Sequence, residues 1–278
     1  MKKAAFTLAE TLATLGVIGI IAMITIPAVI TDYRIQTFKT QKQVFSENFA
    51  DAMNSMTVFE GGINKADTTE AFVEDYLTQY LSIGKICKTS DNGYPNDCGF
   101  QTGSVYQTPG ASSYVAVPFT SNENFNGSED LVGALTNNGI SFLVAYNQDC
   151  KKADSSSETD FVKNAACVNV IYDVNGTSGP NIVGMDVGFL TVFYPKSART
   201  GSPVLYNKEL TSATDKSNAE TYCSSLKNNG ILGLPTAEEQ GAMIVNASLL
   251  GTGTSIWSLK KMSSSANDSG SSVICVYR

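Results

Sequence analysis

Acidic and amide side chains gather in the segment YDVNGTSGPNIVGMDVGF, which covers residues 172–189. Carboxylate and amide oxygens are ligands that Ca²⁺ prefers, and the glycines between them allow a tight loop. A calcium site is therefore one interpretation. The EF-hand spacing is absent, however, and no bidentate glutamate closes the loop. The pattern favours the second interpretation, a network of Asx turns between two strands. The candidate oxygen donors are Asp173, Asn175, Asn181 and Asp186.

The six cysteines are the second group of residues that could carry chemistry. None lies in a C-x-x-C pair, so a zinc ribbon or thioredoxin motif is not indicated. An even number in an exported chain predicts three disulfides, although the sequence alone selects no pairing. We expect sequential pairing, in which the first two bridges close short loops rich in turn residues. The alternative is six buried free thiols in a cytosolic protein. The expected pairs are Cys87–Cys98, Cys150–Cys167 and Cys223–Cys275.

The composition limits the class of function. Histidine is absent, which removes the commonest general base, the usual Ser and Cys triads and most catalytic zinc sites. The formal net charge of -7 offers no basic surface to nucleic acid. The sequence also lacks a phosphate-binding loop, a G-x-S-x-G motif and a clustered acid pair. We therefore expect no enzyme, and no cofactor apart from the calcium ion considered above.

The N-terminal segment has two lysines, then Glu10, then a long apolar stretch. Residues 12–30 carry no charge, and as a helix they would be about 28 Å long, roughly one hydrocarbon core. An ordinary signal peptide has a shorter apolar stretch and a cleavage site after it. The apolar residues that follow have helical spacing, so we expect one helix from about Phe6 to about Phe59. Its amphipathic stripe comprises Phe38, Phe45, Phe49, Ala52 and Met56.

The middle of the chain predicts a short helix and a sheet. Asp67-Thr-Thr-Glu70 is typical of a capping box and predicts a helix from about Thr68 to Leu81. Apolar and β-branched segments separated by Gly, Asn and Ser predict an antiparallel meander. Its candidate strands are Tyr114–Phe119, Ile140–Tyr146, Val168–Val174 and Val187–Tyr194.

The N-terminus resembles those of type IV pilins and type II secretion pseudopilins. The matching elements are a short basic leader, Ala5, the run Phe6-Thr-Leu-Ala-Glu10, a uniform apolar stretch and Pro27. The resemblance implies that a prepilin peptidase removes a leader of residues 1–5 and that the new N-terminus at Phe6 is methylated. The family usually has Gly before the cut, where this chain has Ala5.

The same resemblance implies roles for Glu10 and Pro27 in assembly. Cleavage creates a cationic amine at Phe6, and Glu10 of one subunit can pair with the amine of its neighbour in a filament. A charge within a membrane is tolerated when it is paired. Pro27 removes a backbone hydrogen bond and should kink or loosen the helix. The alternative is a plain, uncleaved membrane anchor.

The C-terminal region, residues 202–278, resembles bacterial surface domains with a C-type-lectin-like or formylglycine-generating-enzyme-like fold. This resemblance implies a Cys223–Cys275 bridge, and it does not imply catalysis. Tyr277 departs from the pattern, and the alternative is that this segment completes a pilin sheet. The matching stretches are Ala219-Glu-Thr-Tyr-Cys223, Leu234-Pro-Thr236, Trp257-Ser258 and Val273–Arg278.

Together, the expected fold class is α+β, with a long N-terminal helix packed on an antiparallel β-sheet and a small disulfide-bonded C-terminal α+β region. The expected domains are the helix at 6–60, a pilin-like globular β domain at 61–198 and the lectin-like region at 202–278. Two surface-assembly functions compete, and a membrane-tethered enzyme has little support.

The first function is a type IV pilin-like, minor subunit that crosses the inner membrane once, assembles into an extracellular pilus and displays a C-terminal surface for adhesion. The alternative is a periplasmic pseudopilin of a type II secretion system. The implied partners are other pilin or pseudopilin subunits, the prepilin peptidase and methyltransferase, and the membrane assembly platform. The sequence identifies no surface ligand.

Overall fold

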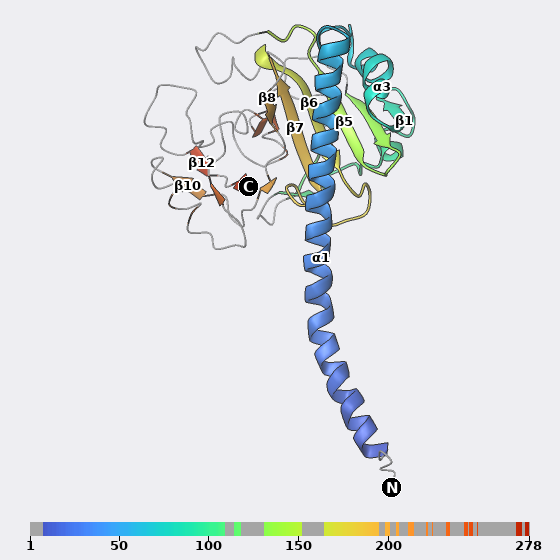
Figure 1. Cartoon of the computed structure of the whole chain (residues 1–278), viewed down its shortest axis with the longest axis vertical. Helices are drawn as coiled ribbons and strands as arrows, with labels where there is room; N and C mark the ends of the chain where they lie inside the picture. The colour runs from blue at the N-terminus through green and yellow to red at the C-terminus, as the bar shows by residue number, and fades with distance from the viewer. Residues whose placement is uncertain are drawn as a thin grey trace.

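Helix α1 (Leu8–Phe59) projects from a globular head, which is formed by its C-terminal half and by the elements that follow it (Figure 1). The helix continues through Pro27. The α+β class predicted from the sequence is confirmed, because the head combines helices with an antiparallel sheet and disulfides. The computed structural model describes residues 8–108, 114–117, 131–151, 164–194, 198–200, 204–205, 211–213, 221, 224, 232–233, 242–243, 245–246, 249, 271–273 and 276–277.

The C-terminal half of α1 packs on the sheet through the stripe predicted from the sequence. Phe45, Phe49, Ala52 and Met56 are at most 3% exposed, and Phe38 packs at the edge of the same cluster. Burial of this much apolar surface is what holds the helix against the head. Ring centroids in this contact are 4.7 Å apart for Phe45 and Tyr172 and 5.5 Å apart for Phe45 and Phe142.

The main sheet has the strand order β1-β4-β5-β6-β7-β8, and every neighbouring pair is antiparallel. The antiparallel arrangement is thus as expected, and three of the expected strands correspond to β5, β6 and β7. Strands β1, β4 and β8 were not predicted. The bounds are β1 (Ile83–Lys88), β4 (Val132–Thr136), β5 (Ser141–Tyr146), β6 (Ala166–Asp173), β7 (Val187–Phe193) and β8 (Ala198–Thr200).

The candidate strand at 114–119 does not join this sheet. Its described part is β3 (Tyr114–Val115), which pairs with β2 (Tyr106–Gln107) in a separate two-stranded ribbon. Two further small sheets lie in the C-terminal region, with β10 beside β12 and β13 between β11 and β9. Their bounds are β9 (Val204–Leu205), β10 (Thr211–Ala213), β11 (Leu232–Gly233), β12 (Ser271–Val273) and β13 (Val276–Tyr277).

Both faces of the main sheet are buried at its central strands β5 and β6 and at the neighbouring strand β7. On β5, Phe142 and Val144 belong to the cluster beneath α1, whereas Leu143 and Ala145 belong to a second cluster on the opposite face. This is why every residue of β5, β6 and β7 is buried. In a sheet with one solvent-exposed face, buried and exposed residues would alternate along each strand. The second cluster is completed from the C-terminal region by Ala242, Met243, Val245 and Leu249.

A buried polar contact fixes the same C-terminal segment on the sheet. The Nδ2 of Asn169 on β6 donates to Oδ1 of Asn246 at 3.0 Å, and the Nδ2 of Asn246 donates back at 3.1 Å. Thr191 on β7 also donates to Oδ1 of Asn169, at 2.8 Å. Since buried amides that are fully paired specify one arrangement, Asn246 and its described neighbours Ala242, Met243 and Val245 are an integral part of the head.

The short helix after α1 begins one residue later than the capping-box pattern implies. The N-cap is Thr68, whose hydroxyl accepts a hydrogen bond from the backbone N of Ala71 at 3.1 Å. Asp67 instead accepts a hydrogen bond from Gln148. The segment divides into α2 (Thr69–Ala71), the π-helix η1 (Phe72–Leu77) and α3 (Thr78–Tyr80).

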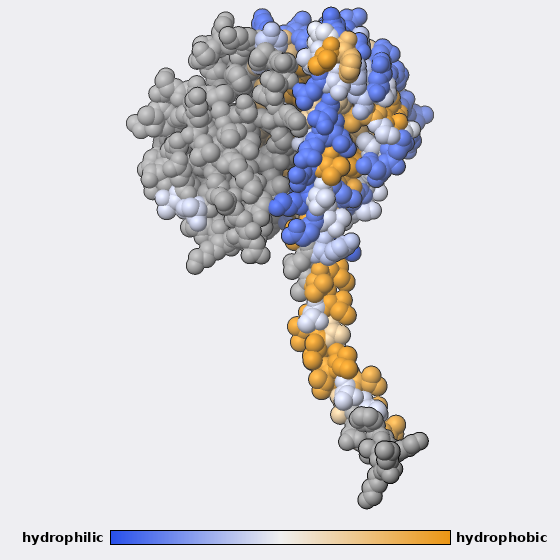
Figure 2. Space-filling view, viewed as in Figure 1, coloured by the Kyte–Doolittle hydropathy of each residue, from blue (hydrophilic) through white to orange (hydrophobic). Residues whose placement is uncertain are grey.

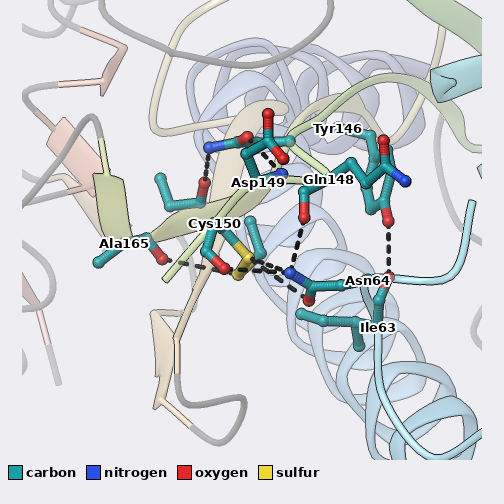
Figure 3. Close-up of a disulfide and its surroundings, with 10 residues drawn as sticks. Ile63, Asn64, Tyr146, Gln148, Asp149, Cys150 and Ala165 are labelled. Atoms are coloured by element: carbon teal, nitrogen blue, oxygen red, sulfur yellow. Dashed lines mark hydrogen bonds between the residues drawn. A yellow bond between two sulfur atoms is a disulfide. The ribbon is translucent and has the colours of Figure 1, made fainter. Parts of the chain in front are cut away.

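Two disulfides brace the head, and both match the sequential pairing. Cys87 on β1 bridges to Cys98 at the end of the 3₁₀ helix η2 (Asn96–Cys98), and Cys150 after β5 bridges to Cys167 on β6. Figure 3 shows the second bridge beside the loop that follows α1, where Asn64 donates to the carbonyls of Gln148 and Cys150 at 2.8 and 3.0 Å. The expected Cys223–Cys275 bridge lies outside the described residues.

Candidate functional site

The projecting half of α1 is an apolar surface that the head leaves exposed. Figure 2 shows this part of the helix as a continuous hydrophobic column below the head. Between Leu12 and Ile26 its large side chains are 53–76% exposed, far more than the buried stripe further along the helix. The residues concerned are Leu12, Leu15, Val17, Ile18, Ile20, Ile21, Met23, Ile24 and Ile26.

Threonine hydroxyls within this column do not make it polar. Thr11, Thr14 and Thr25 each donate to a carbonyl of α1 three or four residues earlier, at 2.8–2.9 Å. A hydroxyl bonded back to its own helix no longer needs water as a partner. The column therefore presents methyl and methylene groups almost throughout.

The structure describes two of the four residues with predicted roles in processing and assembly. Ala5 and Phe6 are outside the described residues. Glu10 and Pro27 both lie within α1. Within the part of the chain that the structure describes, no helix meets the length and hydropathy required to cross a membrane.

The second candidate site is the connection between β6 and β7. Asp173 ends β6, and Asp186 directly precedes β7. The Asp186 carboxylate accepts hydrogen bonds from the backbone N of Asn181 at 2.8 Å and of Ile182 at 2.7 Å. Oδ1 of Asp173 accepts one from the backbone N of Asn175 at 3.0 Å. These bonds form the turn network that the sequence favours, and they bring all four predicted oxygen donors together.

The two carboxyl groups of this loop are fully buried, with no exposed surface on either residue. Burial raises the pKa of Asp173 to about 8, and the neighbouring charge of Asp186 adds to the increase. Burial also raises the pKa of Asp186, which hydrogen bonds from the backbone and from the Asn175 side chain oppose. Two buried carboxylates this close cannot both carry an uncompensated charge.

Lys42 of α1 reaches the same loop, a contact that the sequence analysis did not predict. Its Nζ donates a hydrogen bond to the carbonyl oxygen of Gly184, and its side chain is buried. Burial lowers the pKa of Lys42 to about 8, while the charge of Asp186 acts in the opposite direction. The ammonium group therefore supplies part of the positive charge that the loop needs.

Several buried oxygens around the loop have no hydrogen-bond partner among the described residues. They are Oγ of Ser141, Oδ2 of Asp173, Oδ1 of Asn175 and Oδ1 of Asn181. Ser141 starts β5 directly opposite Asp173 in the sheet register, and it too was missed by the sequence analysis. A search of the described residues for three or more clustered His, Cys, Asp or Glu side chains finds no such group, because amides supply half of the donors here.

Comparison with known proteins adds no relative. No family model matches the chain, and no curated protein or solved structure matches it either.

Proposed function

We propose that the chain is a type IV pilin-like subunit, which anchors in the inner membrane through the N-terminal half of α1 and assembles with other subunits into a pilus. The observation that carries the proposal is the division of α1 into two halves. One half is buried on the sheet, and the other is an apolar column exposed on all sides outside the head. Apolar surface on this scale needs another apolar environment.

Two environments suit the exposed column in turn. A lipid bilayer accepts a helix whose backbone bonds and threonine hydroxyls are internally satisfied. A bundle of identical helices in a fibre accepts the same surface, since apolar side chains pack equally well against one another. The residues from Phe6 to Glu10 supply the charges that such a fibre would pair, as the resemblance to pilins implies.

The head then faces away from the fibre axis. The described C-terminal residues Ala242, Met243, Val245 and Leu249 lie on the opposite face of the sheet from α1, and so away from the packed helices of such a fibre. A surface for adhesion or interaction would lie there, which fits a minor subunit better than the bulk component of a fibre.

The experiment that tests the function is a comparison of Glu10→Ala with Glu47→Ala in cells that lack the native chain. Glu47 lies on the same helix, is exposed and makes one hydrogen bond, with Gln43, so its loss should leave assembly unchanged. We expect Glu10→Ala to remain in the inner membrane but to disappear from sheared surface fibres. Equal amounts of both variants in fibres would contradict the assembly role.

The same cells distinguish a pilus from a secretion system. A pilus subunit should be recovered from the culture medium in fibres, with protein secretion unaffected by its deletion. If deletion instead blocks secretion of exported enzymes and no surface fibre contains the chain, the pilus assignment is wrong and the pseudopilin alternative is correct.

A further inference from the structure

The β6–β7 loop and its neighbour Ser141 have buried oxygens that lack hydrogen-bond donors. The backbone N–H groups of Asn175, Asn181 and Ile182 are paired with the two carboxyl groups, yet four buried oxygens have no hydrogen-bond partner in the part of the chain that the structure describes. An unpaired buried oxygen costs about 1–3 kcal/mol in a protein, so several in one place need a common explanation.

The amide orientations at Asn175 and Asn181 are fixed by their other contacts. Nδ2 of Asn175 donates to the carbonyl oxygens of Ser178 and Gly179, so a flipped amide would place its oxygen against both carbonyls. Nδ2 of Asn181 donates to Oε1 of Gln101, and that amide is fixed in turn because its Nε2 donates to the carbonyl of Thr177. The unpaired atoms are therefore oxygens in both residues.

A proton cannot satisfy this group of atoms. A proton on Oδ2 of Asp173 would donate to a single acceptor and would leave the amide oxygens of Asn175 and Asn181 without a partner. Lys42 does not satisfy them either: its Nζ donates to the Gly184 carbonyl, and none of these oxygens has a hydrogen-bond partner among the described residues. One cation in contact with several oxygens resolves both the missing donors and the proximity of two carboxylates.

We propose that Asp173, Asn175, Asn181 and Asp186 form a binding site for one Ca²⁺ ion, with the Ser141 hydroxyl beside it. Two carboxylates and two amide oxygens are a hard, oxygen-only donor set of mixed charge, which suits Ca²⁺. Mg²⁺ is a poorer fit, because it retains most of its water, whereas Asp173, Asn181 and Asp186 are buried and the unpaired donor oxygens have almost no exposed surface.

Two backbone features keep the space around the donors open. Asn181 has a φ of 55°, a left-handed conformation that asparagine tolerates and β-branched residues do not. Gly99 has a φ of 81°, and a Cβ at this position would collide with the Ser141 hydroxyl. A side chain at Gly99 would therefore disturb the loop through Ser141, although residue 99 is 74 positions from Asp173 in the chain.

The test is the thermal stability of the full chain, purified in detergent at pH 7.5, with CaCl₂, with MgCl₂ or with EGTA. At a Ca²⁺ concentration about a hundredfold above the dissociation constant, we expect Tm to increase by roughly 5–10 °C relative to EGTA. Isothermal titration should give one bound Ca²⁺ per chain. The proposal is independent of the pilin-like function, because no fibre is needed to measure binding.

Three variants locate the site. Asp173→Asn and Asn181→Gly should both lose the Ca²⁺-dependent increase in Tm, and Asn181→Gly keeps the left-handed backbone accessible if the first variant folds poorly. Asp75→Asn is the matched control, since Asp75 is an exposed aspartate on η1 and should respond as the unaltered chain does. The proposal is overturned if Tm and heat of titration are the same in Ca²⁺ and EGTA, or if Mg²⁺ stabilises the chain as strongly as Ca²⁺ does.

Discussion

Lys42 of α1 donates a hydrogen bond from Nζ to the carbonyl oxygen of Gly184, which lies 142 residues further along the chain. Both residues are buried, so neither group has water as an alternative partner. The contact joins the helix to the loop that carries Asp173 and Asp186. The position of α1 on the head and the conformation of this loop are therefore coupled.

Replacement of Lys42 by Met tests this coupling. Methionine keeps most of the apolar stem but leaves the Gly184 carbonyl without a donor, so the free energy of unfolding should fall by about 1–3 kcal/mol. Thermal unfolding followed by circular dichroism measures the change. Lys65→Met, at an exposed position, is the control and should behave as the unaltered chain. Equal stability of the two variants would mean that the contact contributes nothing.

The pH dependence of stability should report the Asp173 carboxyl group. Its pKa is about 8 in the folded chain and near 3.8 when unfolded, so the folded state holds an extra proton between these values. In calcium-free buffer this contribution is fully present below about pH 4 and is lost as the pH rises through about 8. We expect Tm to decrease from pH 5 to pH 8, and the decrease should be smaller in Asp173→Asn. If Tm decreases equally with pH in the unaltered chain and in Asp173→Asn, the raised pKa of Asp173 is contradicted.

Lys42 acts in the opposite sense at higher pH. Its folded pKa of about 8 lies below the ordinary 10.5, so the folded state is penalised while the side chain is charged and gains stability as the pH rises above about 8. The Asp173 measurement is for this reason confined to the range below pH 8.

The N-terminus of the mature chain gives a third prediction. Intact-mass and peptide mass spectrometry of chain recovered from membranes should find Phe6 as the first residue, carrying one methyl group. The resemblance to pilins implies this processing, because Ala5-Phe6 stands where that family is cleaved relative to the glutamate and the apolar stretch. Retention of Met1, or cleavage near Ala28, would contradict it.

The disulfides give a fourth prediction. Cys150 and Cys167 are 17 residues apart, and Cys87 and Cys98 are 11 apart. Loops of this size should contribute roughly 2–4 kcal/mol each, so replacing both cysteines of either pair by Ala should lower the free energy of unfolding by that amount. Peptide mapping without reduction should recover these two bridges together with Cys223–Cys275. A linkage between Cys98 and Cys150 would contradict the sheet topology.

The C-terminal segment gives the fifth prediction. Met243 is fully buried on the sheet face opposite α1, so Met243→Ala should cost about 2–5 kcal/mol. Ser224→Ala, at an exposed position, is the control and should have little effect.

Deletion of residues 202–278 would expose the same face of the sheet, including Phe189 and Leu143, and the truncated chain should be degraded. A stable truncated head would contradict the packing described here.

Much of the fold could be predicted from local sequence, and the strands that were not predicted share a common cause. The stripe from Phe38 to Met56 was predictable because helical spacing repeats over several turns, and β5 to β7 because long apolar runs are unambiguous. Strand β1 has Lys85 and Lys88 within six residues and lies at the sheet edge, and β4 is short with Gly and Ala at its centre. Neither has a period that separates a strand from a loop.

The residues of the candidate loop were likewise only partly predictable. Asp173, Asn175, Asn181 and Asp186 lie within 14 residues and were recognisable as possible ligands together. Lys42 and Ser141 reach the loop from α1 and β5, and no local pattern assigns a lysine on a helix or a serine at a strand end to a distant turn. Long-range polar contacts depend on the completed sheet register, which no local stretch of the sequence specifies.

The two described disulfides each join cysteines that are consecutive among the six in chain order. If the part of the chain after the membrane anchor enters an oxidising compartment in sequence order, Cys87 and Cys98 arrive before any other thiol, and Cys150 then arrives before Cys167. Each native partner is thus the next thiol to arrive, so random reshuffling by an isomerase is not needed to reach these two pairs. Oxidation during translocation would lock β1 to η2 before β5 and β6 have emerged, and the head would be assembled in the order in which its strands are made.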